Sequence, residues 1–356
     1  MPDTRLRSFT AAVAVAVVVA GCAGSAPRAA DTPSPAVSPA RDTVAPGKRI
    51  VGYYASWGVR RGAPVSAIRG ELLTHINYAF ARVTPEGLAA LGDPCVDIGE
   101  CAAGVEDPNP VPGGNFEQLR LLKQRFPHLK VLISFGGWSG SRYFSDAAAT
   151  PEARRRFVES ALDLFIRQHP GVFDGIDIDW EYPVRGGLPE NTTRPEDREN
   201  YTLLMAEFRR ALDEQGARDG RQYLLTIAAA AGQSHIRNLD VPGLAAVLDF
   251  INVMTYDFHT AGKSTHFNSP LFVASDDPTP ELSIDHTVRA YLAAGLPAEQ
   301  LVVGVPFFGY GYGGVPADSN GLFQPAELNG FEPRDSTQPR PWGVGAVRFH
   351  QVIREA

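Results

Sequence analysis

The stretch Phe173-Asp174-Gly175-Ile176-Asp177-Ile178-Asp179-Trp180-Glu181-Tyr182-Pro183 places four carboxylates in a short apolar run. Side chains alternate between the two faces of a strand, so a strand here would put Asp177, Asp179 and Glu181 on one face. The other face would carry Ile176, Ile178 and Trp180, with Asp174 near the strand entrance. Because acids on one face repel one another, we predict that this strand carries a site.

Same-face residues two apart on a strand lie about 6.6 Å apart along it. Carboxylates this close cannot all ionise easily, so the row is expected to retain a proton at neutral pH. Glu181 is outermost, which makes it the natural general acid, with Asp177 and Asp179 tuning it. The alternatives are a divalent-metal cluster or an acidic strand end that is simply solvated.

The rest of the chain alternates short apolar runs with amphipathic segments. The expected strands are residues 50–57, 75–80, 130–137, 172–181, 223–231, 250–257 and 301–308. One expected helix covers residues 151–169, with Thr150 as N-cap and Pro151 as first residue, and a stripe of Phe157, Val158, Ala161, Leu162, Phe165 and Ile166. Further helices are expected at 115–126, 200–215 and 285–294. Such alternation predicts a parallel α/β sheet.

Polar and aromatic residues follow several of these strands at their carboxyl ends. They are Trp57, Phe80, Gly136-Gly137-Trp138, Glu181 and Tyr256-Asp257. Site residues from many strand ends favour a TIM (β/α)8 barrel over an open doubly wound sheet. Seven strands are found where a closed barrel needs eight. Residues after Phe308 are rich in Gly and Pro, and 341–356 suggest a loop and a short helix.

The composition is that of a globular protein of one large domain or two smaller ones. The 356 residues are 44% hydrophobic and 21% charged, with a formal net charge of −7 from 33 basic and 40 acidic residues. This charge argues against a nucleic-acid partner and suits a neutral polymer.

The N-terminus has the pattern of an export signal. Arg5 and Arg7 precede an apolar run at 11–20, which ends in Val19-Ala20-Gly21-Cys22. This ending resembles a bacterial lipobox, which predicts lipidation of Cys22 after a signal peptide at 1–22; the alternative is a plain cleaved signal peptide. Residues 23–48 are rich in Pro and Ala and suggest a disordered tether. We therefore expect an exported protein, either secreted or held on the outer face of the membrane only by its lipid.

Two further cysteines, Cys95 and Cys101, are six residues apart. In an exported protein they could form a disulfide, and the alternative is a pair of free thiols. A metal site is disfavoured because no histidine lies near them in sequence.

Five motifs in order resemble glycoside hydrolase family 18, the chitinases and their relatives. Asp174-x-x-Asp177-x-Asp179-x-Glu181 resembles the family's DxxDxDxE signature. The others are Ser134-Phe135-Gly136-Gly137, similar to SxGG; Met254-Thr255-Tyr256-Asp257, similar to MxYD; and the first two strands, Tyr53-Tyr54-Ala55-Ser56-Trp57 and Asn77-Tyr78-Ala79-Phe80. The resemblance covers residues 50–311 and is strongest to bacterial chitinases, whose barrel carries an α+β insertion after strand seven. The catalytic domain is therefore expected at 49–356.

The resemblance implies retaining, substrate-assisted hydrolysis of β-1,4-linked N-acetylglucosamine polymers. Glu181 would be general acid and base, Asp179 would orient the acetamido group, Asp177 would support Asp179, and Tyr256 would bind the acetamido oxygen. Substrate contacts are implied for Tyr53, Trp57, Phe80, Gly137, Trp138, Tyr182, Met254 and Asp257. Structural roles are implied for Ser134 and Asp174. No cofactor or metal is required, and we expect a monomer.

The chain departs from the family pattern at two places. Tyr310 stands where a substrate-binding arginine is expected after strand seven. No segment matches the eighth strand and its tryptophan, because Trp342 lies in a Pro-Trp-Gly turn. We therefore expect that the chain ends inside the insertion. The alternative functions are a chitin-binding protein without activity and an inactive remnant on the same scaffold.

Overall fold

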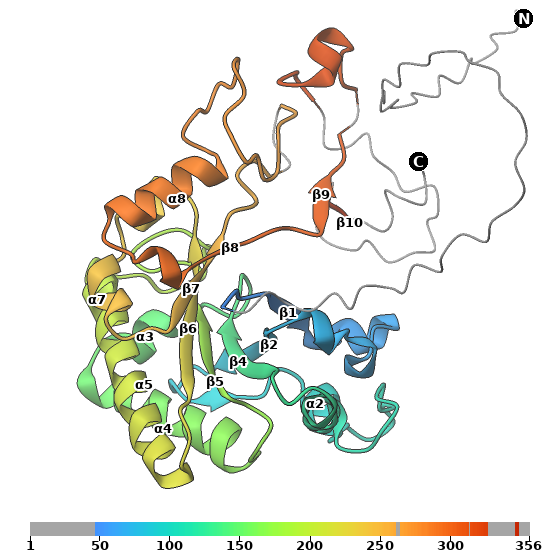
Figure 1. Cartoon of the computed structure of the whole chain (residues 1–356), viewed down its shortest axis with the longest axis vertical. Helices are drawn as coiled ribbons and strands as arrows, with labels where there is room; N and C mark the ends of the chain where they lie inside the picture. The colour runs from blue at the N-terminus through green and yellow to red at the C-terminus, as the bar shows by residue number, and fades with distance from the viewer. Residues whose placement is uncertain (1–46, 261–263, 313, 327–345, 349–356) are drawn as a thin grey trace, which may run out of the picture.

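The computed structural model describes residues 47–260, 264–312, 314–326 and 346–348. Its centre is a sheet of seven parallel strands in the order β1-β2-β4-β5-β6-β7-β8 (Figure 1). The strands are β1 (Val51–Ala55), β2 (His75–Val83), β4 (Lys130–Gly136), β5 (Gly175–Asp179), β6 (Leu224–Ala230), β7 (Phe250–Met254) and β8 (Leu301–Val303). A short strand β3 (Ala89–Ala90) adds to β2 in the antiparallel sense. The predicted seven-stranded parallel sheet, part of a TIM barrel, is confirmed within the described residues.

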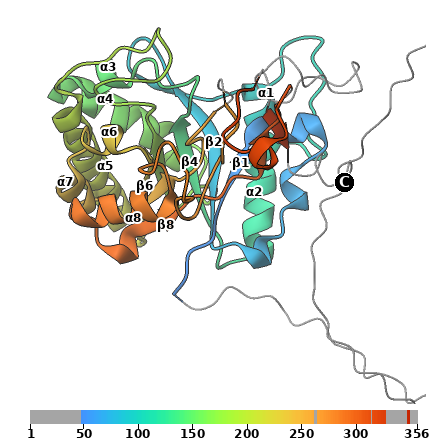
Figure 2. The ribbon, with the colours of Figure 1, turned by 90° about the horizontal axis from the view of Figure 1, so that it is seen from above.

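Helices cover the outer side of this sheet. The longer ones are α2 (Gly114–Arg125), α4 (Pro151–Ala161), α5 (Asp197–Asp219) and α8 (Ile284–Ala293). The shorter ones are α1 (Pro94–Ile98), α3 (Phe144–Ala148), α6 (Gln233–Ile236) and α7 (Val241–Ala245). Seen from above, α3 to α8 lie on one side of the strands, while α1 and α2 lie beside β1 and β2 (Figure 2). No helix in these described segments has the length and apolarity needed to cross a membrane.

The predicted helix at 151–169 forms as expected in its first part. The Thr150 hydroxyl accepts a hydrogen bond from the Ala153 N–H at 3.2 Å, and Pro151 is the first helical residue. A π-helical segment, η4 (Leu162–Arg167), continues the helix. The predicted stripe is buried, and it packs the rings of Phe157 and Phe165 edge-on against Phe135 of β4 at 5.4 and 5.3 Å.

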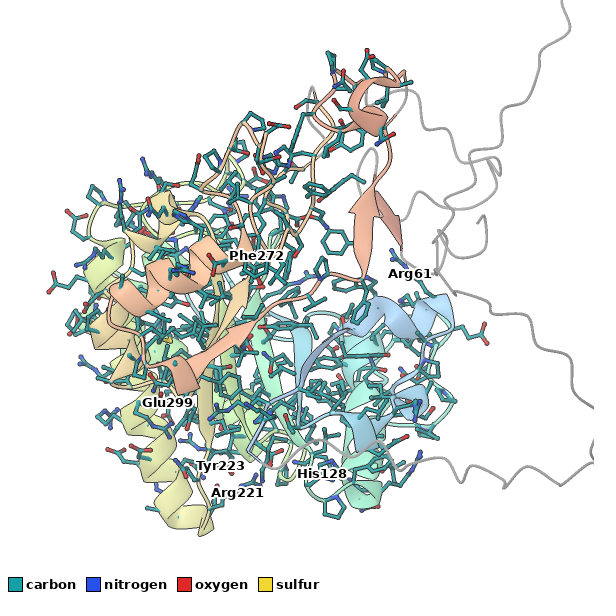
Figure 3. The ribbon with its side chains drawn as sticks, turned by 45° about the horizontal axis from the view of Figure 1, so that its top comes forward. Arg61, His128, Arg221, Tyr223, Phe272 and Glu299 are labelled. Carbon is teal, nitrogen blue, oxygen red and sulfur yellow. A yellow bond between two sulfur atoms is a disulfide. The ribbon has the colours of Figure 1, made fainter. Side chains whose placement is uncertain are left out.

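An ionic cluster around the buried Asp174 carboxylate lies at the end of the sheet where the strands begin. Asp174 accepts a hydrogen bond from the Val131 N–H at 2.8 Å and pairs with Lys123 of α2 at 2.7 Å and with Arg221. Arg221 is labelled at this lower edge in Figure 3. These contacts join β4, α2 and the start of β6 through one carboxylate. Asp174 therefore lies far from the strand ends that carry the site, in keeping with a structural role.

The strand predicted at 301–308 is wrong in its second half. β8 ends at Val303, and Phe308 belongs instead to β9 (Phe308–Tyr310), which pairs antiparallel with β10 (Ala346–Arg348). Pro306 lacks the N–H that a continuing strand would donate. The loop and short helix predicted for 341–356 are also corrected at 346–348, which form a strand. Within the described residues, β1 and β8 are the two ends of the parallel sheet, and no pairing joins them.

The two cysteines expected to pair are joined in the structure. Cys95 lies in α1, and a disulfide links it to Cys101. Asp93 caps this helix by accepting a hydrogen bond from the Cys95 N–H at 3.1 Å. Cys22 and the signal and tether segments up to residue 46 lie outside the described residues.

Candidate active site

The acidic row lies at the carboxyl end of β5, in the arrangement that the alternation predicts. The exposed fractions are 0% for Asp177, 5% for Asp179 and 9% for Glu181, the last lying two residues beyond the strand. The opposite face is equally buried, since Trp180 stacks on Phe144 at 5.5 Å. Three carboxyl groups are thus withdrawn from water in one row.

Asp177 is the most heavily hydrogen-bonded member of the row. One carboxylate oxygen accepts hydrogen bonds from Tyr53 at 2.9 Å and Ser134 at 2.7 Å. The other accepts from Thr226 at 2.5 Å and Asn252 at 3.4 Å. Burial raises the pKa of Asp177, and these four donors oppose the rise. Asp177 is therefore a fixed anchor that ties β1, β4, β6 and β7 to β5.

Asp179 has the opposite character. It is buried, and its Oδ1 atom has no hydrogen-bond partner among the described residues. Burial raises the pKa of Asp179 well above its ordinary value, and the charges of Glu181 and Asp177 raise it further. A buried carboxyl oxygen without a partner is costly, so a donor supplied by a bound molecule would be favourable here.

The backbone of Glu181 is held at two points. Its N–H donates to the Ser141 hydroxyl at 2.8 Å, and its carbonyl accepts from the Asn191 side chain at 2.9 Å. Burial raises the pKa of Glu181 to about 7, the charge of Asp257 adds to the rise, and a hydrogen bond from Tyr182 opposes it. A carboxyl group in this state can donate and accept a proton near neutral pH, as general acid–base catalysis requires.

Two glycines let the end of β4 approach β5 closely. Gly136 has φ +107°, and a Cβ there would lie 2.3 Å from the Asp179 carbonyl oxygen. Gly137 has φ +71°, its N–H donates to that same oxygen at 2.9 Å, and a Cβ there would lie 2.6 Å from the Phe80 ring. Only glycine fits both conformations and both distances. Substrate contact by Gly137 stays a prediction.

Tyr256 and Asp257 follow β7 directly, close enough to the acidic row for its charges to act on Tyr256. Burial raises the pKa of Tyr256, as do the charges of Asp179, Glu181, Asp257 and Asp177 in that order. The Tyr256 hydroxyl therefore stays protonated and available as a donor. Met254, the last residue of β7, is half-buried beside them.

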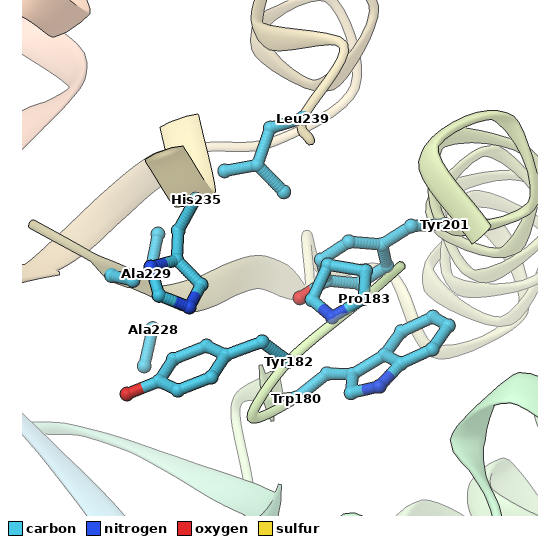
Figure 4. Close-up of a pocket in the computed structure, with 9 residues that line it drawn as sticks. Trp180, Tyr182, Pro183, Tyr201, Ala228, Ala229, His235 and Leu239 are labelled. Atoms are coloured by element: carbon cyan, nitrogen blue, oxygen red, sulfur yellow. The ribbon is translucent and has the colours of Figure 1, made fainter. Parts of the chain in front are cut away.

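The predicted aromatic platforms differ in exposure. Trp138 is 52% exposed, and the Trp57 and Phe80 ring centres lie 6.5 Å apart. Sugar contact by these rings stays a prediction. Tyr182 packs against His235 at 4.5 Å, beside a small pocket (Figure 4). The pocket is lined by Trp180, Tyr182, Pro183, Tyr201, Ala228, Ala229, Ala230, His235 and Leu239.

The structure brings most predicted site residues to one edge of the sheet and leaves Asp174 at the other. It adds four residues that sequence reasoning missed: Ser141, Asn191, Thr226 and Asn252. Thr226 and Asn252 lie on predicted strands, so the alternation of side chains along each strand could have indicated that they point toward the site. Ser141 and Asn191 lie in loops, where no periodicity marks them. No group of three potential metal ligands occurs in the segments that the structure describes.

Comparison with known proteins assigns this site to a family. Residues 49–347 match the model of glycosyl hydrolases family 18. Chitinase A1 of Niallia circulans is 42% identical in an alignment of length 330 that covers 82% of this chain and 47% of that protein. The chain thus spans about half the length of this relative, and 19% of that of chitinase ChiA of Flavobacterium johnsoniae.

Solved structures agree with this assignment. The catalytic domain of chitinase B from Arthrobacter TAD20 superposes with a TM-score of 0.72 at 33% identity, covering 79% of this chain and 75% of that one. The Group IV chitinase of Ostrinia furnacalis, in complex with allosamidin, has a TM-score of 0.72 at 32% identity, covering 87% and 78%. With 299 of the 356 residues (49–347) matched by the family model, the chain belongs to glycosyl hydrolases family 18.

Proposed function

We propose that this protein hydrolyses β-1,4-linked N-acetylglucosamine polymers, chitin or chitooligosaccharides, with retention at the anomeric carbon. The observation that carries the proposal is the pairing of two unlike carboxyl groups. Glu181 has a pKa near neutrality, and beside it Asp179 holds a buried oxygen without a partner. The names of the chitinases to which the chain is similar support the substrate class.

In the first step the acetamido oxygen of the substrate attacks its own anomeric carbon. The glycosidic C–O bond breaks, and Glu181 gives its proton to the leaving oxygen. The product of this step is a cyclic oxazolinium ion on the sugar. No carboxylate of the protein needs to act as nucleophile.

Asp179 orients the nucleophile. Its unpartnered Oδ1 would accept the acetamido N–H and would stabilise the positive charge that develops on the ring. Hydrogen bonds from Ser134 and Thr226 hold Asp177, the neighbour of Asp179, in place. The Tyr256 hydroxyl would donate a hydrogen bond to the acetamido oxygen.

In the second step the Glu181 carboxylate accepts a proton from a water molecule, which attacks the anomeric carbon. The oxazolinium ring opens, and the acetamido group is restored. Two successive displacements at one carbon give retention. Trp138 would stack on a sugar ring near this carbon.

Turnover of a fluorogenic chitooligosaccharide by the full chain tests the proposal. Glu181→Gln removes the proton donor, so kcat is expected to fall by about a hundredfold or more. Glu299→Gln, which changes an exposed glutamate labelled at the left in Figure 3, is the control and should retain wild-type turnover. NMR of the first product should show the retained anomer.

Other outcomes would replace the proposal. If the wild-type protein binds chitin without hydrolysing it, the chain is a chitin-binding protein. If it neither binds nor hydrolyses chitin, the chain is an inactive remnant. Equal turnover by wild type and Glu181→Gln would remove Glu181 from its assigned role.

We also propose that the chain is exported and carries a lipid on Cys22. The support is the sequence Val19-Ala20-Gly21-Cys22 after an apolar run. Expression in a bacterium fed a labelled fatty acid should label the wild type and leave Cys22→Ser unlabelled. Label in both proteins would contradict the proposal.

A further inference from the structure

Tyr310 occupies the position after the seventh parallel strand where an arginine is expected. It lies in β9, and its hydroxyl donates a hydrogen bond to the Asp257 Oδ1 atom at 2.6 Å. Asp257 in turn follows β7 directly after Tyr256. A residue 53 positions away in sequence is thus attached to the carboxylate beside the acidic row.

Asn268 completes this attachment. Its Oδ1 atom accepts the Asp257 N–H at 2.8 Å, and its Nδ2 donates to the Phe308 carbonyl at 3.1 Å. Asp257 has φ +54°, a conformation that this local bonding stabilises. The Asp257 backbone and side chain are therefore both connected to β9, the backbone through Asn268 and the side chain through Tyr310.

Aromatic packing keeps β9 against the end of β7. The Phe308 ring meets Tyr256 edge-on at 6.0 Å and meets Tyr310 edge-on at 6.1 Å. The three rings form a continuous row from the proposed acetamido-binding Tyr256 to Tyr310. A displacement of Tyr310 would therefore disturb its hydrogen bond to Asp257 and, through Phe308, the packing of Tyr256.

The ionisable groups around Asp257 are carboxyl and phenol groups, which are either neutral or negatively charged. Asp257 raises the pKa of Glu181, and among the described residues its charge also raises the pKa of Tyr256 and Tyr310. Glu181 is faced in addition by Asp179 and Tyr182, and Tyr310 by Tyr312. Desolvation raises the pKa of Asp257, and the Tyr310 hydrogen bond opposes this rise.

We propose that Tyr310 is a positioning residue that holds the Asp257 carboxylate, as an anion, beside the general acid Glu181. The inference rests on the proposed function and deepens it. A neutral donor fixes Asp257 without cancelling its charge, whereas an arginine would place a cation next to both carboxyl groups. The tyrosine thus keeps Glu181 protonated up to a higher pH than an arginine would.

Carboxyl 13C NMR titration tests this proposal without requiring turnover. The Asp257 and Glu181 signals are assigned by their loss in Asp257→Asn and Glu181→Gln. In Tyr310→Phe the Asp257 midpoint should rise by about half a pH unit, because a donor to the anion is lost. The Glu181 midpoint should fall, because the Asp257 charge is no longer held beside it.

Two further variants sharpen the test. Tyr310→Arg should lower the Glu181 midpoint more than Tyr310→Phe does, since it adds a cation. Tyr312→Phe is the matched control, because the Tyr312 hydroxyl has no hydrogen-bond partner in the described segments; it should leave both midpoints unchanged. The basic limb of the pH profile of kcat/KM should follow the Glu181 midpoint in every variant.

A double variant separates positioning from simple stability. If Tyr310 acts through Asp257, Tyr310→Phe should not move the Glu181 midpoint further in an Asp257→Asn background. Unchanged midpoints in Tyr310→Phe, or equal shifts in Tyr310→Phe and Tyr312→Phe, would overturn the inference. Absence of turnover by the wild-type protein would refute the proposed function. It would leave the positioning role of Tyr310 open to the titrations, which do not require turnover.

Discussion

Replacement of Glu181 by Gln should stabilise the folded protein at neutral pH while lowering kcat by about a hundredfold or more. The physical reason is linkage: an acid whose pKa is higher in the folded state than in the unfolded state prefers to fold protonated. Burial gives Glu181 a folded-state pKa of about 7, against an ordinary value of 4.5. Its ionisation therefore costs stability progressively as pH rises from about 4.5 to about 7.

The size of the effect follows from this difference. A shift of about 2.5 units at 1.36 kcal/mol per unit makes the wild type roughly 3 kcal/mol less stable at pH 8 than a chain with a neutral residue at 181. The same substitution removes one of the charges that raise the pKa of Asp179, which adds to the effect with the same sign. For a domain of this size, 3 kcal/mol corresponds to a rise in Tm of about 5 °C.

Urea unfolding at pH 4, 5.5, 7 and 8 measures this difference. Glu181→Gln and wild type should have similar unfolding free energies at pH 4, where both are neutral at this position, and should diverge above pH 5. The exposed Glu299→Gln serves as control and should follow the wild type throughout. A difference that does not change with pH, or a variant less stable than the wild type at pH 8, would refute the assigned protonation behaviour.

Two other substitutions test how the site is supported. Asp174→Ala removes a buried carboxylate that pairs with the half-buried Lys123 and accepts the Val131 N–H, so urea unfolding should show a loss of about 2 kcal/mol; a loss below about 1 kcal/mol would contradict its structural role. Gly136→Ala places a Cβ 2.3 Å from the Asp179 carbonyl oxygen at φ +107°, so we expect a Tm lower by several degrees and loss of turnover. Wild-type turnover in Gly136→Ala would show that the close approach of β4 and β5 is dispensable.

Local sequence pattern was sufficient for the acidic strand and for the helix that begins at Pro151. Alternation along 173–183 placed Asp177, Asp179 and Glu181 on one face, because the period of a strand does not depend on its neighbours. Capping chemistry at Thr150 located a helix start for the same reason. The resemblance of five motifs then supplied the family, which the family model confirms.

Local pattern failed where a segment's conformation depends on distant partners. The run 301–308 reads as one strand, yet only Leu301–Val303 pairs with β7, while Phe308 pairs with a segment about 40 residues further along the chain. Nothing within the run indicates this division except Pro306.

The sequence by itself determined which carboxylates share a face, which residues end the strands and which family the motifs resemble. The tertiary structure alone decided that Thr226 lies in register with Asp177 and that Asn252 reaches the same carboxylate from β7. It also decided that Asp179 keeps an oxygen without a partner among the described residues, and that Tyr310 reaches Asp257. The reason is that register between strands and withdrawal from water arise only when segments far apart in the chain pack together. The pKa values on which the proposed chemistry depends are consequences of that packing.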